Sequence, residues 1–313
     1  MPEITHRGRS WLVADGSNLL DALNGVGLHV PFSCRAGSCQ ACMVRCVRGQ
    51  PQDARPHALD SARHAAGWRL ACQCNVVEDL DIELFDPERQ GLNARVQGLD
   101  WLGEQVLRLR LVPERPVRYE AGQHLLLWND HGVARPYSVA SVPGEDPWLE
   151  FHIDCRHSGA FCDSARSLAL HDTLRIGQPR TGALRYEPEW QMRPLLLLAA
   201  GTGLAPLWGV AREALRQGHL GPIRLLHFCR GESYLRAALD ALVEGQGNLS
   251  VEQVDSAEAA SRLRSLRIAS RQEYALICGG RDFVEDCAKR MFLAGLPQGQ
   301  VLSDTFLTRQ SEA

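Results

Sequence analysis

The sequence contains no apolar run long enough to cross a membrane. Its longest aliphatic stretch, PLLLLAA at 194–200, falls far short of the roughly 20 residues that a transmembrane helix needs. The first residues, MPEITHRGRSWLVADG, also lack the apolar core of a secretory signal peptide. We therefore expect a cytoplasmic protein without a membrane segment.

Lysine is almost missing, and so is any excess of positive charge. Of the 34 lysines and arginines together, only Lys289 is a lysine, and the net charge is −3. A protein that binds nucleic acid through its phosphates usually carries a basic patch or stripe, so we do not expect nucleic-acid binding. We attribute the shortage of lysine to compositional bias.

The groupings that carry hydrolytic chemistry are missing as well. We find no paired carboxylates and no Ser-His-Asp arrangement. Histidines such as His124, His152 and His157 are expected to be ordinary barrel or loop residues. The chain also has no internal repeat and no low-complexity tract.

The chain is longer than one hydrophobic core usually organises, since it has 313 residues. Short alternating segments between about 93 and 187 predict a small antiparallel barrel or sandwich: EQVLRLRLVP, QHLLLWND, PYSVASV, WLEFHIDC and DTLRIG. From 193 onward, buried strands alternate with helical stretches, which predicts βαβ units and a parallel sheet. We expect three domains, at 1–88, 92–188 and 192–313.

Four of the 11 cysteines fall between Cys34 and Cys46. Cytosolic thiols stay reduced, so a tight cluster favours metal binding over disulfides. The spacing Cys-x4-Cys-x2-Cys is that of plant-type [2Fe-2S] proteins and requires a fourth, distant thiolate, which RLACQC at 69–74 supplies. Zinc is the main rival, but only one Cys-x2-Cys pair occurs here. Reduced core cysteines are the other alternative.

The segments PFSCRAGSCQAC and LACQ resemble the plant-type [2Fe-2S] ferredoxin domain over about the first 88 residues. The resemblance implies a β-grasp fold. In that family the last ligand precedes a glutamine, which points to Cys72, although Cys74 lies close enough to compete. The implied cluster ligands are Cys34, Cys39, Cys42 and Cys72.

The stretch ARPYSVAS at 134–141 carries a cation, an aromatic ring and a hydroxyl at alternating positions of an expected strand. On such a strand Arg135 and Tyr137 would share a face, and Ser141 is a further candidate for that face. Such a face suits a planar anionic cofactor, because a guanidinium pairs with a pyrophosphate and a tyrosine ring can lie on a flavin. An exposed arginine and a half-buried tyrosine on an ordinary strand would give the same pattern.

The segment RPYSVAS, preceded by YEAGQHLLL, resembles the Arg-x-Tyr-Ser motif of the ferredoxin–NADP reductase superfamily. The resemblance implies that Arg135, Tyr137 and Ser138 contact a flavin, with Ser138 a candidate catalytic residue. The family's Gly-x-x-Ser element corresponds to Gly159 through Cys162, where cysteine replaces the serine. Relatives with an N-terminal ferredoxin domain generally carry FAD rather than FMN, so we expect FAD.

The stretch LLLLAAGTGLAPLWGVAREAL predicts a strand, a glycine turn and a helix, in which Gly201 and Gly203 would admit a pyrophosphate to backbone amides. Pro206 replaces the third glycine of the usual dinucleotide fingerprint. The form Gly-Thr-Gly-x-x-Pro is, however, similar to that of the same reductase superfamily. The resemblance therefore implies nucleotide contacts from Gly201, Thr202, Gly203 and Pro206.

Three later residues extend this resemblance. In LICGGRDFVEDC, Cys278 is implied to lie near the nicotinamide and flavin as a candidate catalytic residue, with a buried structural cysteine as the alternative. In VLSDTFLTRQSEA, Phe306 is a candidate to cover the flavin, with core packing as the alternative. In HFCRGESYL, Glu232 favours a free ribose diol and Arg230 a 2′-phosphate, so we expect NADH, with NADPH as the alternative.

Together, the motifs predict an oxidoreductase that passes electrons from NAD(P)H through FAD to a [2Fe-2S] cluster and on to a redox protein. The resemblance is to reductase components that serve oxygenases or a deoxysugar dehydrase. A redox sensor or binding module without turnover is the alternative of a different class. Ferricyanide or cytochrome c reduction would separate the two.

Overall fold

The computed structural model describes residues 1–32, 34–180 and 182–306. One compact unit contains Met1–Leu92 with Leu126–Pro136 and Arg175–Arg180, and a second contains the rest of the described chain. The division into three domains at 1–88, 92–188 and 192–313 stays a prediction. None of the helices in the described ranges combines the length and apolarity needed to span a membrane.

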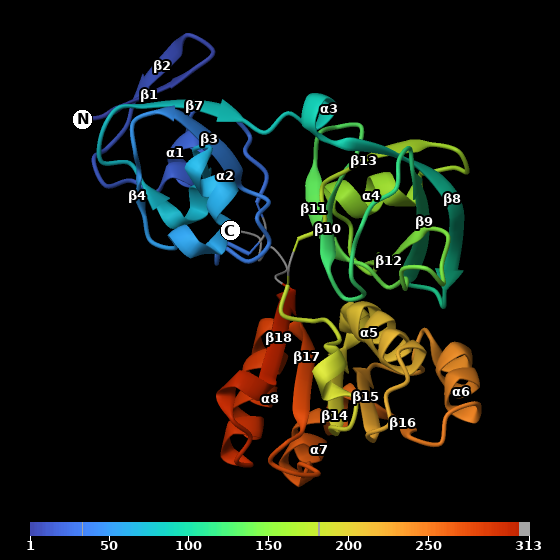
Figure 1. Cartoon of the computed structure of the whole chain (residues 1–313). Coiled ribbons are helices and arrows are strands. Elements are labelled where there is room, and N and C mark those ends of the chain that lie inside the picture. The colour runs from blue at the N-terminus through green and yellow to red at the C-terminus, as the bar shows by residue number, and fades with distance from the viewer. Residues whose placement is uncertain (33, 181, 307–313) are drawn as a thin grey trace. The chain divides into compact units, whose positions relative to one another are not determined.

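The N-terminal part contains a five-stranded mixed sheet in the order β2-β1-β7-β3-β5 (Figure 1). Strands β1 and β7 are parallel, and the other neighbouring strands of this sheet are antiparallel. A short helix, α1 (Leu19–Gly25), is capped by the Asn18 side chain and buries three leucines in the core. The sheet strands are β1 (Glu3–His6), β2 (Arg9–Leu12), β3 (Met43–Arg48), β5 (Trp68–Leu70) and β7 (Leu80–Leu84).

Smaller elements complete this part of the chain. Strands β4 and β6 form a separate two-stranded sheet. The elements are β4 (Gln52–Asp53), η1 (Pro56–Ala58), α2 (Ser61–Ala65), η2 (Ala71–Gln73), β6 (Cys74–Asn75) and α3 (Pro87–Gln90). A mixed sheet with a helix packed on it agrees with the predicted β-grasp architecture.

The predicted antiparallel sheet is confirmed in the central part. Its order is β11-β10-β13-β8-β9-β12. In β9, leucines at alternate positions are buried while Arg108 and Arg110 are only half-buried, as expected for a strand with one face on the core. The elements are β8 (Leu92–Leu102), β9 (Val106–Pro113), β10 (His124–Trp128), β11 (Ala134–Ser138), β12 (Leu149–Asp154), α4 (Ala160–Arg166) and β13 (Thr173–Ile176).

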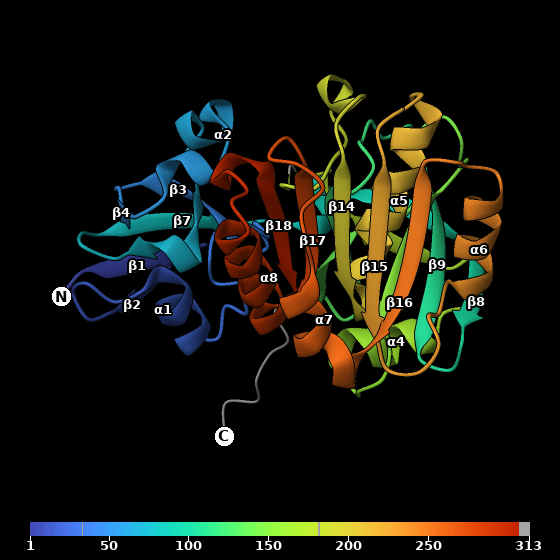
Figure 2. The ribbon, with the colours of Figure 1, turned by 90° about the horizontal axis from the view of Figure 1, so that it is seen from below.

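The C-terminal part is a parallel five-stranded sheet in the order β16-β15-β14-β17-β18, which confirms the βαβ prediction (Figure 2). The elements are η3 (Pro188–Trp190), β14 (Leu195–Ala200), η4 (Gly201–Gly203), α5 (Leu204–Arg216), β15 (Ile223–Cys229), α6 (Arg236–Glu244), β16 (Leu249–Asp255), η5 (Ser256–Glu258), α7 (Ala259–Ser265), β17 (Tyr274–Gly280), α8 (Arg281–Leu293), η6 (Gln298–Gln300) and β18 (Val301–Phe306).

Strand β14 is buried on both faces because helices cover the sheet from both sides. Leu195 and Leu197 belong to the core formed with α5 and α6, whereas Leu196 and Leu198 belong to the core formed with α7 and α8. This two-sided burial explains the uninterrupted leucine run in the sequence. The turn that follows β14 therefore starts from a rigid strand.

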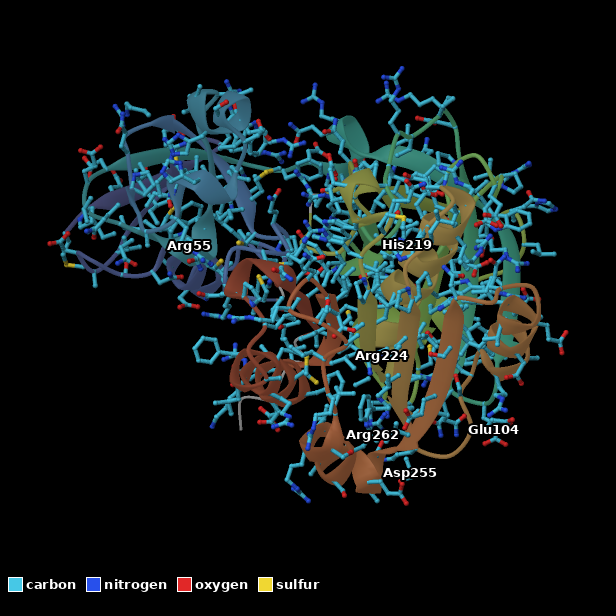
Figure 3. All side chains as sticks on the ribbon, turned by 60° about the horizontal axis from the view of Figure 1, so that its bottom comes forward. Arg55, Glu104, His219, Arg224, Asp255 and Arg262 are labelled. Atoms are coloured by element: carbon cyan, nitrogen blue, oxygen red, sulfur yellow. The ribbon has the colours of Figure 1, made fainter. Side chains whose placement is uncertain are left out.

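Arginine supplies the cation of two ion pairs around this sheet, from Arg224 and Arg262, which are labelled in Figure 3. Arg224 on β15 donates to the fully buried Glu273 at 2.9 Å, and Arg262 in α7 pairs with Glu252 on β16. The half-exposed Arg262–Glu252 pair contributes about 0–1 kcal/mol, whereas the carboxylate of the Arg224–Glu273 pair is out of contact with solvent.

Candidate functional site

The four predicted cluster ligands come together as two thiol pairs. Hydrogen bonds join the thiols of Cys34 and Cys39, and those of Cys42 and Cys72. Each iron of a [2Fe-2S] cluster takes two terminal thiolates, so two pairs are the arrangement that such a cluster requires. Over the described ranges, the structure brings no three His, Cys, Asp or Glu side chains together in a way that suits a single metal ion. The pairing of the four thiols fits a two-iron cluster.

Backbone amides of the cluster loop point at the cysteine sulfurs. The amides of Ala36 and Cys39 each lie 3.3 Å from Cys34 Sγ, and the amide of Gly37 donates to the Cys72 thiol. Gly37 has a φ of +81°, which glycine adopts without strain. The loop therefore offers the hydrogen bonds that thiolate ligands and cluster sulfurs need.

Cys72 and its neighbour Cys74 differ in how deeply they are buried. Hydrogen bonding from the Cys42 thiol lowers the pKa of Cys72 to about 7. Burial raises the pKa of Cys74 well above that of a free thiol, and Cys74 packs in the hydrophobic core of the N-terminal part with no exposed surface. The placement supports Cys72 as the fourth ligand.

The predicted flavin residues lie on β11. Arg135 and Tyr137 stand two residues apart on this strand, and Ser138 at its end is 8% exposed. The Tyr137 ring lies 5.0 Å from the Phe161 ring of α4. Ser141 lies beyond the end of β11. Its buried hydroxyl bonds to the Tyr119 hydroxyl and accepts a hydrogen bond from the Glu150 amide.

The Gly159–Cys162 element begins α4. Gly159 is the residue that caps the helix, and its amide donates to Asp163 Oδ2 at 3.0 Å. The Cys162 thiol donates to the carbonyl of Asp154 at 3.2 Å. The amide of Gly159 is thus already bonded within the element, and the Cys162 side chain points toward the end of β12.

The predicted nucleotide turn, η4, links β14 to α5. Gly201 has a φ of +54°, and a Cβ on Gly203 would lie 2.2 Å from the Cys278 carbonyl oxygen, so only glycine fits at Gly203 without a shift of backbone. Thr202 lies between them, and Pro206 is buried in the first turn of α5. At the Gly201 end the nearest group is the Arg156 guanidinium, whose Nη2 lies 4.0 Å from where a Cβ on Gly201 would stand. A glycine turn at the start of a helix is the kind of site that binds phosphates.

Comparison with known proteins identifies the family. Residues 3–77 match the family model described as "2Fe-2S iron-sulfur cluster binding domain". Reductase component 1 of terephthalate 1,2-dioxygenase from Comamonas sp is 32% identical, over 72% of this chain and 70% of that protein. The ferredoxin–NAD(P)+ reductase component of naphthalene 1,2-dioxygenase/salicylate 5-hydroxylase systems from Ralstonia sp is 30% identical, over 90% and 86%. This chain belongs to the ferredoxin-type NAD(P)H reductases.

The reductase is thus an oxidoreductase that carries electrons from NAD(P)H through FAD and a [2Fe-2S] cluster to a protein acceptor. Solved structures agree in fold. An Amycolatopsis cytochrome P450 reductase aligns with a TM-score of 0.66 at 23% identity, over 98% of this chain and 99% of that one. A ferredoxin reductase of carbazole 1,9a-dioxygenase aligns with a TM-score of 0.65 at 21% identity, over 98% of both chains.

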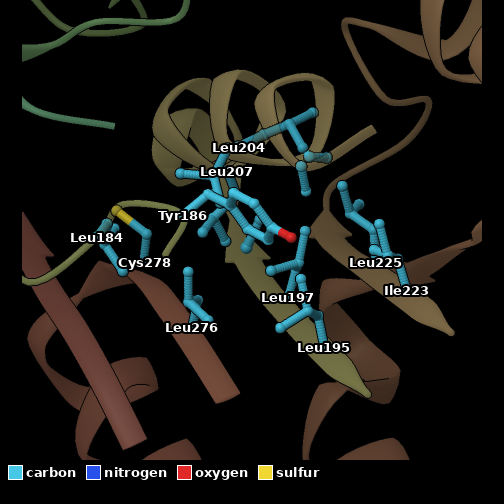
Figure 4. Packing of buried hydrophobic residues seen from close by; sticks show 14 of the residues in the cluster. Leu184, Tyr186, Leu195, Leu197, Leu204, Leu207, Ile223, Leu225, Leu276 and Cys278 are labelled. Atoms are coloured by element: carbon cyan, nitrogen blue, oxygen red, sulfur yellow. The ribbon is translucent and has the colours of Figure 1, made fainter. Parts of the chain in front are cut away.

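Three predicted residues of the reductase lie around the nucleotide-binding sheet. The thiol of Cys278 on β17 is fully buried in the core with Leu184 and Leu276, and burial raises its pKa (Figure 4). Glu232 is exposed in the loop after β15. Phe306 ends β18 and packs in part against the same core as Cys278. The predicted tail beyond Phe306 lies outside the described residues.

Sequence reasoning missed several residues of the reductase that act through contacts distant in sequence. Gln73 Nε2 lies 3.3 Å from Cys72 Sγ and 2.8 Å from the Arg35 carbonyl, so it ties the fourth ligand to the cluster loop. Arg180 is 3% exposed, and its Nε and Nη1 have no hydrogen-bond partner among the residues that the structure describes. Burial lowers the pKa of Arg180 to about 10. For Gln73, the only signal in the sequence was its place directly after Cys72.

His227 was also missed, although it touches the nucleotide turn directly. Its ring is fully buried on β15, with Nε2 3.0 Å from the Gly201 carbonyl and Nδ1 2.7 Å from Ser233 Oγ. A carbonyl only accepts, so Nε2 carries the proton and Nδ1 accepts from the serine hydroxyl. His227 thereby links the Gly201 turn to the loop that carries Glu232.

Proposed function

We propose that this reductase takes its electrons from NADH and delivers them to the oxygenase component of a multicomponent oxygenase. The relatives described above are named as reductase components of dioxygenases, and the aromatic O-demethylase reductase subunit of an Amycolatopsis strain is 31% identical over 70% of both chains. The observation that carries the proposal is that one chain holds both the paired cysteines and the Gly201–Gly203 turn. A cytoplasmic location stays a prediction.

When bound, FAD and the cluster would supply the redox chemistry, which is hydride acceptance from the nicotinamide and single-electron transfer. The residues of this chain bind and orient them. Arg135 would neutralise the flavin diphosphate, Tyr137 would lie on the ring system, and Ser138 would donate a hydrogen bond to it. Gly159 and Cys162 would border the phosphates.

On the nucleotide side, the turn with Gly201, Thr202 and Gly203 would hold the dinucleotide phosphates, with Pro206 fixing the start of α5. Cys278 lies directly beneath this turn, since its carbonyl faces Gly203. Phe306 would contact the flavin from the end of β18. These roles are part of the proposal.

The preference for NADH rests on Glu232, whose carboxylate would accept hydrogen bonds from the two ribose hydroxyls and repel a 2′-phosphate. The adjacent Arg230 is also exposed, so the two side chains favour different nucleotides. We expect Glu232→Ala to raise the KM for NADH several-fold while lowering that for NADPH. An unchanged ratio of the two KM values would contradict the assignment of Glu232.

The acceptor is tested by anaerobic mixing of NADH, the reductase and the purified oxygenase component of a terephthalate dioxygenase. We expect the visible spectrum of the oxygenase to bleach, and Cys39→Ser to stop that bleaching while ferricyanide reduction continues. A deoxysugar dehydrase is the competing acceptor, because a dehydrase reductase of Yersinia pestis is 30% identical over 62% of this chain. Electron transfer to that dehydrase but not to the oxygenase would overturn the proposal.

A further inference from the structure

Two cysteines outside the cluster loop lie side by side. Cys155 directly follows β12, Cys162 lies in α4, and a hydrogen bond joins their thiols. The Cys162 thiol also lies 3.2 Å from the carbonyl of Asp154, the residue before Cys155. We propose that Cys155 and Cys162 form a dithiol that hydrogen peroxide closes to a disulfide, and that the disulfide weakens FAD binding.

Cys162 has the properties of the attacking thiol, and Cys155 has those of the resolving thiol. Cys155 is 5% exposed, whereas Cys162 is half-buried and reachable from solvent. Hydrogen bonding from Cys155 lowers the pKa of Cys162 to about 7, with further help from Arg166, while the pKa of Cys155 is raised. A thiolate near neutral pH at a partly exposed position is the form that peroxide attacks.

The chemistry balances with one peroxide. The Cys162 thiolate attacks one peroxide oxygen, the O–O bond breaks, and the leaving hydroxide takes up a proton to become water. Sulfur is thereby oxidised to the sulfenic acid. The Cys155 sulfur then attacks the Cys162 sulfur, the S–O bond breaks, and a second water leaves as the disulfide forms. Two thiols and one peroxide give one disulfide and two waters.

Closure must move the segment between the two cysteines. A disulfide places its sulfurs about 2.05 Å apart, closer than two hydrogen-bonded thiols, so the first turn of α4 is drawn toward the end of β12. The bond also removes the proton that Cys162 donates to Asp154. Gly159 lies between these two points, and the effect on FAD rests on the flavin contact proposed for it.

Contacts around the pair keep the two cysteines together in the reduced protein. Arg166 donates to the Cys155 carbonyl and pairs with Asp163, which in turn accepts the Gly159 amide. Closure therefore needs only a local shift rather than unfolding of α4. This distinguishes the pair from Cys229, whose thiol donates to the backbone carbonyls of His227 and Gly231.

Peptide mapping tests the disulfide directly. Holoenzyme is treated with hydrogen peroxide, remaining thiols are blocked with N-ethylmaleimide, and the protein is digested with trypsin without reduction. Arg156 stands between the two cysteines, so cleavage after it places them on separate peptides. We expect a cross-link between the peptide that ends at Arg156 and the peptide 157–166. It should vanish in Cys155→Ser and Cys162→Ser and persist in Cys229→Ser.

A second readout follows retained FAD rather than activity, because peroxide also attacks iron–sulfur clusters. After gel filtration, the oxidised protein should retain several-fold less FAD than the reduced protein, dithiothreitol should restore rebinding, and Cys155→Ser should be insensitive to peroxide. Oxidation of Cys162 to sulfinic acid, or no reaction, in place of the cross-link overturns the dithiol. A cross-link with unchanged FAD retention overturns the effect on FAD and, with it, the flavin contact assigned to Gly159, while leaving the reductase function untouched.

Discussion

Replacement of His227 by glutamine tests how the nucleotide turn is held. Glutamine can still donate to the Gly201 carbonyl but cannot become charged. The histidine ring is fully buried, and burial lowers its pKa from 6.5 to about 4. The folded protein therefore takes up a proton at this ring only at lower pH than the unfolded chain does.

The sign and size of the effect follow from linkage. Above pH 6.5 the ring is neutral in both states and adds no pH dependence. As the pH falls from 6.5 toward 4, only the unfolded chain gains the proton, so stability is lost. A pKa difference of about 2.5 units corresponds to roughly 3 kcal/mol in all, of which about 2 kcal/mol is lost between pH 7 and pH 5.

Urea unfolding at pH 7, 6 and 5 provides the measurement. We expect His227→Gln to lose about 1–3 kcal/mol at pH 7, because Ser233 keeps an imperfect partner, but to become less sensitive to acid than the wild type by about 2 kcal/mol. The exposed His131 is the matched control, and His131→Gln should follow the wild-type curve. If His227→Gln lost stability with acid as steeply as the wild type, the buried neutral histidine would be refuted.

Three further substitutions test other parts of the site. Cys39→Ser should abolish the reduced-cluster EPR signal while NADH-dependent ferricyanide reduction continues, and loss of both would show that the cluster is needed for folding. Gly203→Ala puts a Cβ 2.2 Å from the Cys278 carbonyl, so we expect a loss of about 1–3 kcal/mol in stability and a raised KM for NADH; a normal KM would contradict the turn's role. Arg180→Met removes a buried cation, so apo-protein stability should rise by about 1–3 kcal/mol in urea unfolding; a loss of stability would show that Arg180 has a partner.

Local sequence patterns predicted those parts of the site that lie on short, continuous segments. The cysteine spacing predicts the set of four ligands because one loop and one distant segment supply them, while their pairing came only from the structure. The glycine turn is predictable because the backbone conformation that it needs is local. Gln73 and His227 were not predictable, since their roles come from partners that only the folded chain supplies. The burial of Arg180 was not predictable either, because it follows from the packing of distant segments.

The same contrast holds for the fold. The segment EQVLRLRLVP became β9, because alternation marks a strand with one buried face. The segment WLEFHIDC became β12, whose residues from Leu149 to Ile153 are all buried. The longest strand, β8, was missed because a register shift between Val96 and Gly98 breaks its alternation. The edge strand β16 was missed because most of its residues are not buried, so it lacks an apolar signal.

The central claim is that electrons pass from NADH through the flavin to the paired-cysteine cluster within this chain. An anaerobic titration of the purified protein with NADH, followed in parallel by visible absorption and low-temperature EPR, tests it most directly. We predict that the flavin absorption bleaches and that a rhombic signal of a reduced [2Fe-2S] cluster appears with it. Bleaching of the flavin without that signal, or no response from either centre, would contradict the account.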